Sequence, residues 1–228
     1  MKLALALDLP SKEENLVLLN EVGQVLKARG ISPQDIWLKV GLRSYIRDGA
    51  SFVRLLKDRG YRIFLDLKLY DIPNTMVDSV GECERLGVDL VTVHASCGLQ
   101  ALRAIASATR RVKIVAVLAL TSFDEEGFEA VYGARIDQVS RRLVTLVYAS
   151  GISGVVCSVH EVGLVKETST SLMAVTPGLR LDSRVDDQRR VATLQEAKKA
   201  GSDIAVVGRP VYAARDRGSA LNALLDCL

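Results

Sequence analysis

Short apolar runs alternate with longer amphipathic stretches along the whole chain. The apolar runs are rich in Val, Ile and Leu, and we expect them to form strands at residues 3–8, 36–40, 62–68, 90–94, 113–120, 154–157, 172–175 and 204–207. The stretches between them carry the helical period, and we expect helices at 11–28, 44–59, 74–86, 98–109, 138–149, 160–167, 188–200 and 219–226. No linker interrupts the alternation, so the pattern predicts one domain of repeated strand and helix units.

The number of units favours a closed barrel. Eight units in 228 residues amount to about 28 residues each, which is the size of a strand, a loop and a helix. Strands that are apolar on both faces suit a parallel sheet covered on both sides, and right-handed crossovers would close eight of them. We therefore predict an α/β fold, a single-domain (β/α)8 TIM barrel over residues 1–228, with a loop and a short helix at 121–137.

Composition and charge exclude several other classes of protein. Hydrophobic residues make up 49% of the chain and charged residues 25%, which excludes a disordered or low-complexity chain. A net charge of +3 without long runs of like charge argues against a nucleic-acid partner. No apolar stretch approaches the roughly 18 residues of a membrane span. The four cysteines show no CxxC spacing and suit a reducing compartment, so we expect a cytoplasmic protein without a membrane partner.

Charged residues gather at the carboxyl ends of the predicted strands. Asp8, Lys39, Asp66, Lys68 and His94 each stand at or near the end of a run that otherwise avoids charge. In a barrel these ends form one face, and that face carries the catalytic groups. A salt-bridge plug is the alternative interpretation, but apolar residues of similar volume would stabilise the barrel mouth better. For His94 alone, a supporting role beneath a site is as good an interpretation as contact with a ligand.

Two loops predict a phosphate site. Pro177, Gly178 and Arg180 follow the seventh strand, and Gly208 and Arg209 follow the eighth. In many barrels these two loops bind phosphate, because glycines let backbone N–H groups approach an oxyanion and arginine adds a charged contact. The two histidines of the chain are far apart and lack HxxxH spacing, so we predict no metal site.

The string D-L-K-L-Y-D-I-P-N-T from Asp66 to Thr75 resembles the D-x-K-x-x-D-I-P-x-T signature of the orotidine 5′-phosphate decarboxylase family. The resemblance extends over nearly the whole chain. It includes Asp8 in A-L-D, Lys39 in K-V-G, His94 in V-T-V-H, Thr121 in L-T-S, Arg180 in P-G-x-R, Gln188 in D-D-Q, and Gly208 and Arg209 in V-G-R-P.

This resemblance implies decarboxylation of orotidine 5′-phosphate to UMP, in de novo pyrimidine synthesis, with no cofactor. It also implies a homodimer in which each site is completed by the partner chain. Lys68 would be the ammonium that stabilises charge at C6 of the pyrimidine and supplies the proton. Asp66 would lie beside the substrate carboxylate, and the partner would contribute Asp71 with Ile72 and Thr75 beside it.

The same resemblance implies how the rest of the substrate would be held. Lys39 would belong to the catalytic charge network and touch the ribose, and Asp8 would bind a ribose hydroxyl. Thr121 or its neighbour Ser122 would contact the base. The phosphate would be held by Arg209 with Gly208 and Gln188, with Pro177 in the neighbouring loop and Arg180 on a closing loop.

Two other functions stay open at this point. One is a magnesium-dependent keto-sugar phosphate decarboxylase or aldolase of the same suprafamily, which shares the D-x-K-x-x-D string but not the I-P-N-T that follows it here. The other is a catalytically silent barrel that binds a phosphate ligand. A silent site would have no reason to keep so many costly charges at one end of the barrel.

Overall fold

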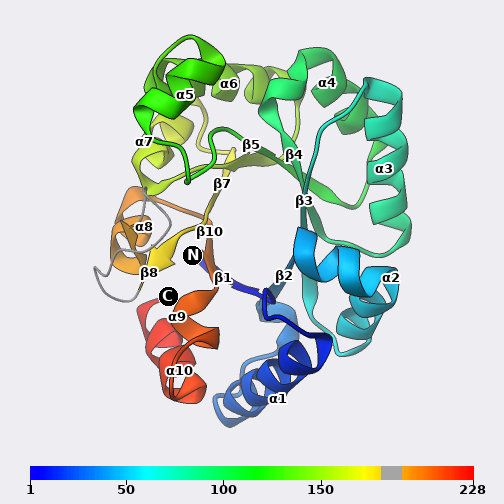
Figure 1. Ribbon diagram of the computed structural model, residues 1–228, viewed down its shortest axis with the longest axis vertical. Helices are drawn as coiled ribbons and strands as arrows, with labels where there is room; N and C mark the ends of the chain where they lie inside the picture. Colours follow the sequence, from blue (N-terminus) through cyan, green and yellow to red (C-terminus); the bar gives the residue numbers. More distant parts are fainter. Residues whose placement is uncertain (181–191) are drawn as a thin grey trace.

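The computed structural model describes residues 1–180 and 192–228 and forms a closed parallel barrel surrounded by helices (Figure 1). The barrel strands follow the order β1, β10, β7, β6, β5, β4, β3, β2, and β2 closes onto β1. Their bounds are β1 Lys2–Ala6, β2 Trp37–Gly41, β3 Arg62–Leu69, β4 Leu90–His94, β5 Lys113–Val117, β6 Gly154–Val156, β7 Met173–Thr176 and β10 Ile204–Val207. The predicted (β/α)8 fold is confirmed.

Helices form the outer layer of the barrel (Figure 1). They are α1 Lys12–Ala28, α2 Leu42–Asp58, α3 Pro73–Arg85, α4 Gly98–Ala108, α5 Glu125–Tyr132, α6 Ile136–Ser150, α7 Val159–Thr168, α8 Leu194–Ala200, α9 Arg209–Tyr212 and α10 Arg217–Cys227. Two short 3-10 turns, η1 Pro33–Asp35 and η2 Ala95–Cys97, precede β2 and α4. Ser11 caps α1 by accepting the Glu14 N–H at 3.1 Å, so a local polar residue sets where the helix begins.

The core has two parts because the strands are apolar on both faces. Inside the barrel lie Ala4, Trp37, Phe64, Leu90, Val115, Val117, Val156, Val175, Ile204 and Val206. A larger set fills the layer between strands and helices, with Leu5, Leu38, Ile63, Leu65 and Val91 fully buried. Apolar side chains from all eight strands therefore fill the middle of the barrel.

Two expected boundaries were wrong. The strand expected at 113–120 ends at Val117. The helix expected at 188–200 begins only at Leu194, because Ala192–Thr193 forms β9 and pairs in parallel with β8, Leu179–Arg180. Residues 188–191 lie outside the described part of the chain. The Thr193 side chain then caps α8, accepting the Glu196 N–H at 3.2 Å, which explains the later start.

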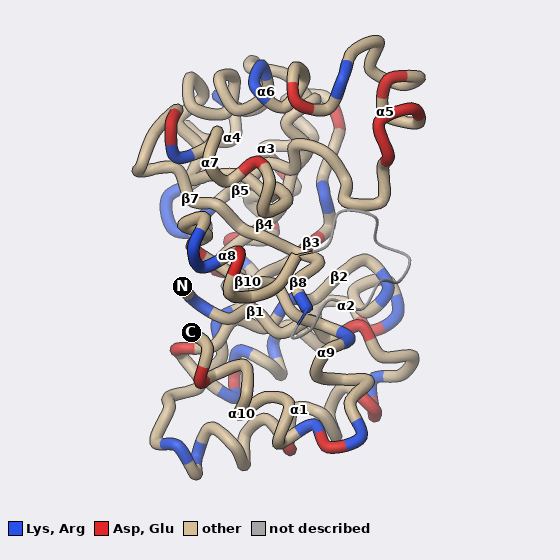
Figure 2. The backbone as a smooth tube through the Cα atoms, turned by 90° about the vertical axis from the view of Figure 1, so that its left-hand side faces the viewer, with Lys and Arg blue, Asp and Glu red and all other residues tan. Residues whose placement is uncertain are grey.

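The segment 121–137 contains the short helix that its pattern predicted. Asp124 caps α5 through the Gly127 N–H at 2.8 Å, and Gly133 ends it at φ 67°. Phe128 stacks on Tyr132 at 4.4 Å and is fully buried in the hydrophobic layer between strands and helices, which attaches this helix to the barrel. Figure 2 shows α5 projecting from the rest of the barrel.

Charges of both signs are interspersed along the chain (Figure 2). Within residues 1–180 and 192–228, no helix is both long and apolar enough to cross a membrane.

Candidate active site

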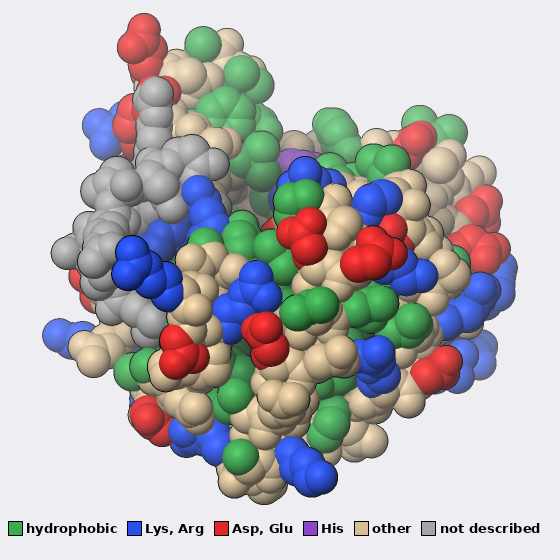
Figure 3. Space-filling view, turned by 60° about the horizontal axis from the view of Figure 1, so that its bottom comes forward, with side chains coloured by type: hydrophobic (Ala, Val, Ile, Leu, Met, Phe, Trp, Pro, Cys, Tyr) green, Lys and Arg blue, Asp and Glu red, His purple; other side chains and the backbone are tan. Residues whose placement is uncertain are grey.

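A cavity of about 450 Å³ opens at the carboxyl ends of the barrel strands. Figure 3 shows a hollow in this surface with basic and hydrophobic side chains on its rim. Its walls include residues that lie in, or directly after, seven of the eight barrel strands. They are Ala6, Asp8, Lys39, Phe64, Asp66, Lys68, Val117, Ala119, Leu120, Thr121, Val156, Cys157, Pro177, Gly178, Arg180, Val206, Gly208, Arg209 and Tyr212.

Four charged side chains of alternating sign form a continuous chain along one wall of the cavity. Lys39 Nζ lies 3.1 Å from Asp8 Oδ2 and 3.6 Å from Asp66 Oδ2. Lys68 Nζ lies 2.8 Å from the other oxygen of Asp66, Oδ1. The order is therefore Asp8, Lys39, Asp66, Lys68, and the two inner members of the chain are also the more buried ones.

Burial and neighbouring charges have opposite effects on the pKa values of Asp66 and Lys39, the two inner members of this series of charges. Burial by itself raises the pKa of Asp66, but Lys39 and Lys68 together with hydrogen bonds from Lys68 and Thr92 outweigh it and hold the pKa below its usual value. Burial likewise lowers the pKa of Lys39, and Asp8 and Asp66 outweigh it, so the net pKa is raised. Both groups are therefore charged at neutral pH, and the cavity presents fixed charges to a ligand.

The backbone departs from regular strand geometry at Lys68. Its φ is +52°, and within residues 1–180 and 192–228 it is the only non-glycine residue with a positive φ. This left-handed conformation costs a non-glycine residue about 1–2 kcal/mol. The pairing of β3 with β4 also shifts between Leu65 and Leu69, which marks a bulge. Lys68 lies within this bulge, and its ammonium reaches Asp66 Oδ1 at 2.8 Å.

Gly41 provides the space that the charge chain needs. A Cβ at this position would lie 3.1 Å from both Asp8 Oδ1 and Lys39 Nζ. That separation is tighter than an ordinary van der Waals contact, so a side chain here would push the ion pair apart. Gly41 at the end of β2 thus lets the Asp8–Lys39 ion pair lie close to the strand backbone.

Loops after β7 and β10 form the adjoining wall, because β10 is the barrel neighbour of β1 and so lies next to Asp8. Pro177, Gly178 and Arg180 line the cavity from the first loop, and Gly208 and Arg209 line it from the second. The Arg180 guanidinium donates to the Leu179 carbonyl at 3.2 Å. Two arginines thus lie on the side of the barrel away from Lys68 at the end of β3, which suits a ligand with an anionic end.

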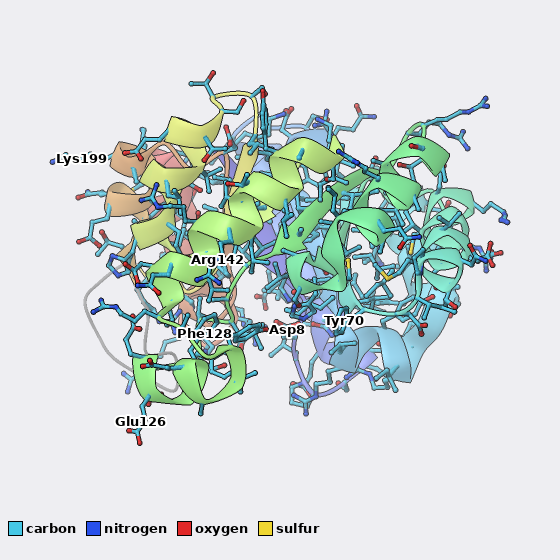
Figure 4. All side chains as sticks on the ribbon, turned by 90° about the horizontal axis from the view of Figure 1, so that it is seen from above. Asp8, Tyr70, Glu126, Phe128, Arg142 and Lys199 are labelled. Carbon is cyan, nitrogen blue, oxygen red and sulfur yellow. The ribbon has the colours of Figure 1, made fainter. Side chains whose placement is uncertain are left out.

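The structure brings some predicted residues to the rim and not others. Thr121 lines the cavity, whereas Ser122 is exposed and does not. His94 is half-buried and does not line the cavity; its ring lies 5.9 Å from that of Tyr70. Burial, and then the nearby charge of Lys68, lower the pKa of His94, although Asp66 opposes this. In Figure 4, Asp8 appears between Tyr70 and Phe128.

Three further predicted residues do not reach the cavity of their own chain. Asp71, Ile72 and Thr75 are all exposed, and none of them lines it. The Asp71 carboxylate accepts the N–H of Ile72 at 2.7 Å. Gln188 lies outside the residues that the structure describes.

Sequence reasoning missed three residues at this site. Tyr212 lines the cavity from α9, a helix that was not expected, and Gly41 borders it. Thr92 is fully buried and bonds both Asp66 and the Lys68 backbone. Its place on the strand face that carries His94 was a signal, but a single buried threonine is common in strands.

Comparisons with known proteins agree with this geometry. Residues 1–224 match the model of a family described as the orotidine 5′-phosphate decarboxylase / HUMPS family. The chain belongs to this family. The curated relative from Nautilia profundicola, named orotidine 5′-phosphate decarboxylase, is 44% identical over 99% of this chain and 98% of its own. The one from Helicobacter pylori bears the same name and is 46% identical over the full length of both chains.

A solved structure of the orotidine 5′-phosphate decarboxylase from Lactobacillus acidophilus is similar to this chain throughout. The TM-score is 0.82 with 31% sequence identity, and the match covers 99% of this chain and 98% of that one. The family that the resemblance implied and the barrel fold that the strand and helix pattern predicted are both confirmed.

Proposed function

We propose that this chain decarboxylates orotidine 5′-phosphate to UMP in pyrimidine biosynthesis, without a cofactor. Two curated relatives that match this chain over nearly their whole length are named orotidine 5′-phosphate decarboxylase. The observation that carries the proposal for this chain is the alternating series of Asp8, Lys39, Asp66 and Lys68 on the wall of the cavity.

The reaction needs fixed charge near one carbon atom. Cleavage of the bond between C6 and its carboxylate releases carbon dioxide and leaves the electron pair in an orbital that the pyrimidine ring cannot delocalise. A cation held next to C6 stabilises that pair. Lys68 Nζ is the proposed cation and then donates its proton to C6, which completes UMP. Asp66, 2.8 Å from Lys68 Nζ, holds the ammonium in place and lies beside the substrate carboxylate.

The remaining lining residues suit the other parts of this substrate. In the proposal, Asp8 and Lys39 bind the ribose, and Thr121 contacts the base. Arg209 with Gly208 holds the phosphate, with Pro177 and Arg180 in the neighbouring loop and Gln188 as a further contact. Phosphate binding far from the reacting carbon supplies the energy to place the substrate carboxylate near Asp66.

We further propose a homodimer with shared sites. Apolar side chains are exposed around the end of β3 and the start of α2: Leu42 and Ile46 lie one turn apart on α2, with exposures of 50% and 80%, and Tyr70 and Ile72 follow β3, with 62% and 66%. Asp71 lies among them. A partner chain that covers these residues would bring its Asp71, with Ile72 and Thr75, toward the neighbouring cavity.

The whole chain then acts as one catalytic domain over residues 1–228 in the cytoplasm. The family match over residues 1–224 and the four free cysteines support this part of the proposal.

The test is an absorbance assay of purified protein with orotidine 5′-phosphate, run with and without EDTA. We expect full consumption of the substrate in both conditions. Folded wild-type protein without activity would overturn the proposal. Loss of activity only with EDTA would overturn cofactor independence and favour the magnesium-dependent relatives, and UMP binding without turnover would favour a silent phosphate-binding barrel.

A further inference from the structure

The hydroxyl of Thr92 connects the backbone of Lys68 to the carboxylate of Asp66. Thr92 lies in β4 with no exposed surface. Its Oγ1 accepts the backbone N–H of Lys68 at 2.8 Å and donates to Asp66 Oδ1 at 3.0 Å. The same Asp66 oxygen accepts from Lys68 Nζ at 2.8 Å. The three residues therefore form a closed ring of hydrogen bonds.

The register of the barrel explains why a side chain takes this position. Leu65 pairs with Val91 and Leu69 pairs with Val93, so three residues of β3 face Thr92 alone. Within this bulge the regular ladder is interrupted, and the Lys68 N–H is bonded to the Thr92 side chain instead of a β4 carbonyl. Because the hydroxyl has one hydrogen, accepting from Lys68 leaves that hydrogen for Asp66.

We propose that Thr92 is a positioning residue that holds Lys68 in its left-handed conformation and aims its ammonium at the reacting carbon. The inference rests on the proposed decarboxylation and adds a residue to it. A lysine at φ +52° keeps that conformation only while its surroundings hold it. Without the hydroxyl, the Lys68 N–H and one Asp66 contact lose their partner, and the backbone gains by relaxing toward a regular strand.

The matched variants are Thr92→Val, which removes the hydroxyl at constant shape, and Thr92→Ser, which keeps it. We expect kcat for orotidine 5′-phosphate to fall roughly 10- to 100-fold in Thr92→Val, since a hydrogen bond to a charged group is lost. KM and the affinity for UMP should change less than about threefold, because the phosphate site is across the cavity. Thr92→Ser should restore most of the lost kcat.

Thr176→Val is the control for the loss of a buried threonine hydroxyl. Thr176 is also fully buried in a barrel strand, and its hydroxyl lies 2.7 Å from that of Ser202, outside the charge chain. We expect it to lower the thermal midpoint while kcat stays within twofold of wild type. A Thr92→Val protein that is folded and equally active, or no more impaired than Thr176→Val, would overturn the positioning role.

Two further measurements keep the proposal testable. If Thr92→Val does not fold, Thr92→Ser and Thr92→Ala differ by the hydroxyl alone, and equal kcat in the two would contradict the proposal. A crystal structure of Thr92→Val, or of Thr92→Ala, should show Lys68 with negative φ and its ammonium beyond hydrogen-bond distance from Asp66; unchanged geometry would contradict it. Inactive wild-type protein overturns the proposed function instead, and the crystal structure then still decides the positioning role.

Discussion

The two ends of the barrel use the same residue types for different purposes. At the amino end, Lys57 pairs with Asp89 at 2.9 Å and Lys166 pairs with Asp203 at 2.7 Å. Each of these carboxylates also accepts a backbone N–H of a neighbouring strand at 2.7 Å. Such a pair joins the end of a helix to the start of a strand, so its role is structural.

At the carboxyl end, the lysines and aspartates bond one another. Asp8, Lys39, Asp66 and Lys68 form one chain along a cavity, and no backbone N–H bonds to Asp8 or Asp66 among the contacts of the described residues. The comparison shows that the hydrogen-bond partners of the carboxylate distinguish the two kinds of ion pair in this barrel. Asp89 and Asp203, which accept from the backbone of a neighbouring strand, support the fold, whereas Asp8 and Asp66, which are held by side chains, lie on the cavity wall.

The largest expected effect separates the two ends directly. Lys68→Ala should lower turnover of orotidine 5′-phosphate at least about 10³-fold while the protein stays folded, because both the cation and the proton donor are lost. Lys57→Ala should keep turnover and lower the thermal midpoint. The measurements are the absorbance assay and thermal unfolding. An equal loss of turnover in both variants would contradict the distinction between a catalytic Lys68 and a structural Lys57.

In the proposed homodimer, the carboxyl end of the barrel would also contain a residue from the partner chain. Lys68→Ala and Asp71→Ala, each inactive alone, should recover about one quarter of wild-type activity when mixed and allowed to exchange subunits, since half of the dimers then hold one complete site. Mass spectrometry of the mixture checks that exchange occurs. No recovery after proven exchange would place Asp71 in the site of its own chain.

Adding a methyl group at one glycine near each end of the barrel tests the same difference between the structural end and the end with the cavity. At Gly154, where β6 begins, a Cβ would lie 2.1 Å from the Met173 carbonyl oxygen, so Gly154→Ala should cost about 3 kcal/mol or more of unfolding free energy. Gly41→Ala should cost less stability and impair turnover, because the contacts at 3.1 Å are with Asp8 and Lys39. Urea unfolding and the activity assay together decide this, and the reverse order of effects would contradict it.

Neutralising an amino-end carboxylate should have a moderate effect on stability alone. Asp89→Asn and Asp203→Asn each weaken a charged hydrogen bond to the backbone and an ion pair, at a cost of about 1–2 kcal/mol after allowance for partial exposure. Urea unfolding measures the loss, and kcat should match that of wild type. A drop in kcat without a loss of stability would contradict a purely structural role for Asp89 and Asp203.

The smallest expected effect concerns His94. Burial and Lys68 lower the pKa of His94 in the folded protein, so below about pH 6.5 the unfolded chain binds more protons at this position. The stability contribution of His94 therefore increases as pH rises from the folded pKa to that of the unfolded chain. Urea unfolding between pH 5 and pH 8 should show a shallower pH dependence for His94→Asn than for wild type; equal slopes would contradict the shift.

The sequence by itself determined the number of strand and helix units, the end of the barrel that carries charge, and the family. These follow from local patterns: apolar runs of strand length, charged residues at the ends of the first four runs, and the string from Asp66 to Thr75. Each is encoded in residues adjacent in the chain, so reading the chain in order is enough to find it.

The tertiary structure alone decided how the charges meet. The left-handed Lys68, the bulge opposite Thr92 and the space at Gly41 depend on the register between neighbouring strands, which are far apart in sequence. The late start of α8 at Leu194 depends likewise on the pairing of β8 with β9. Pairing between distant segments leaves no periodic trace in either segment, because register is a property of two strands together.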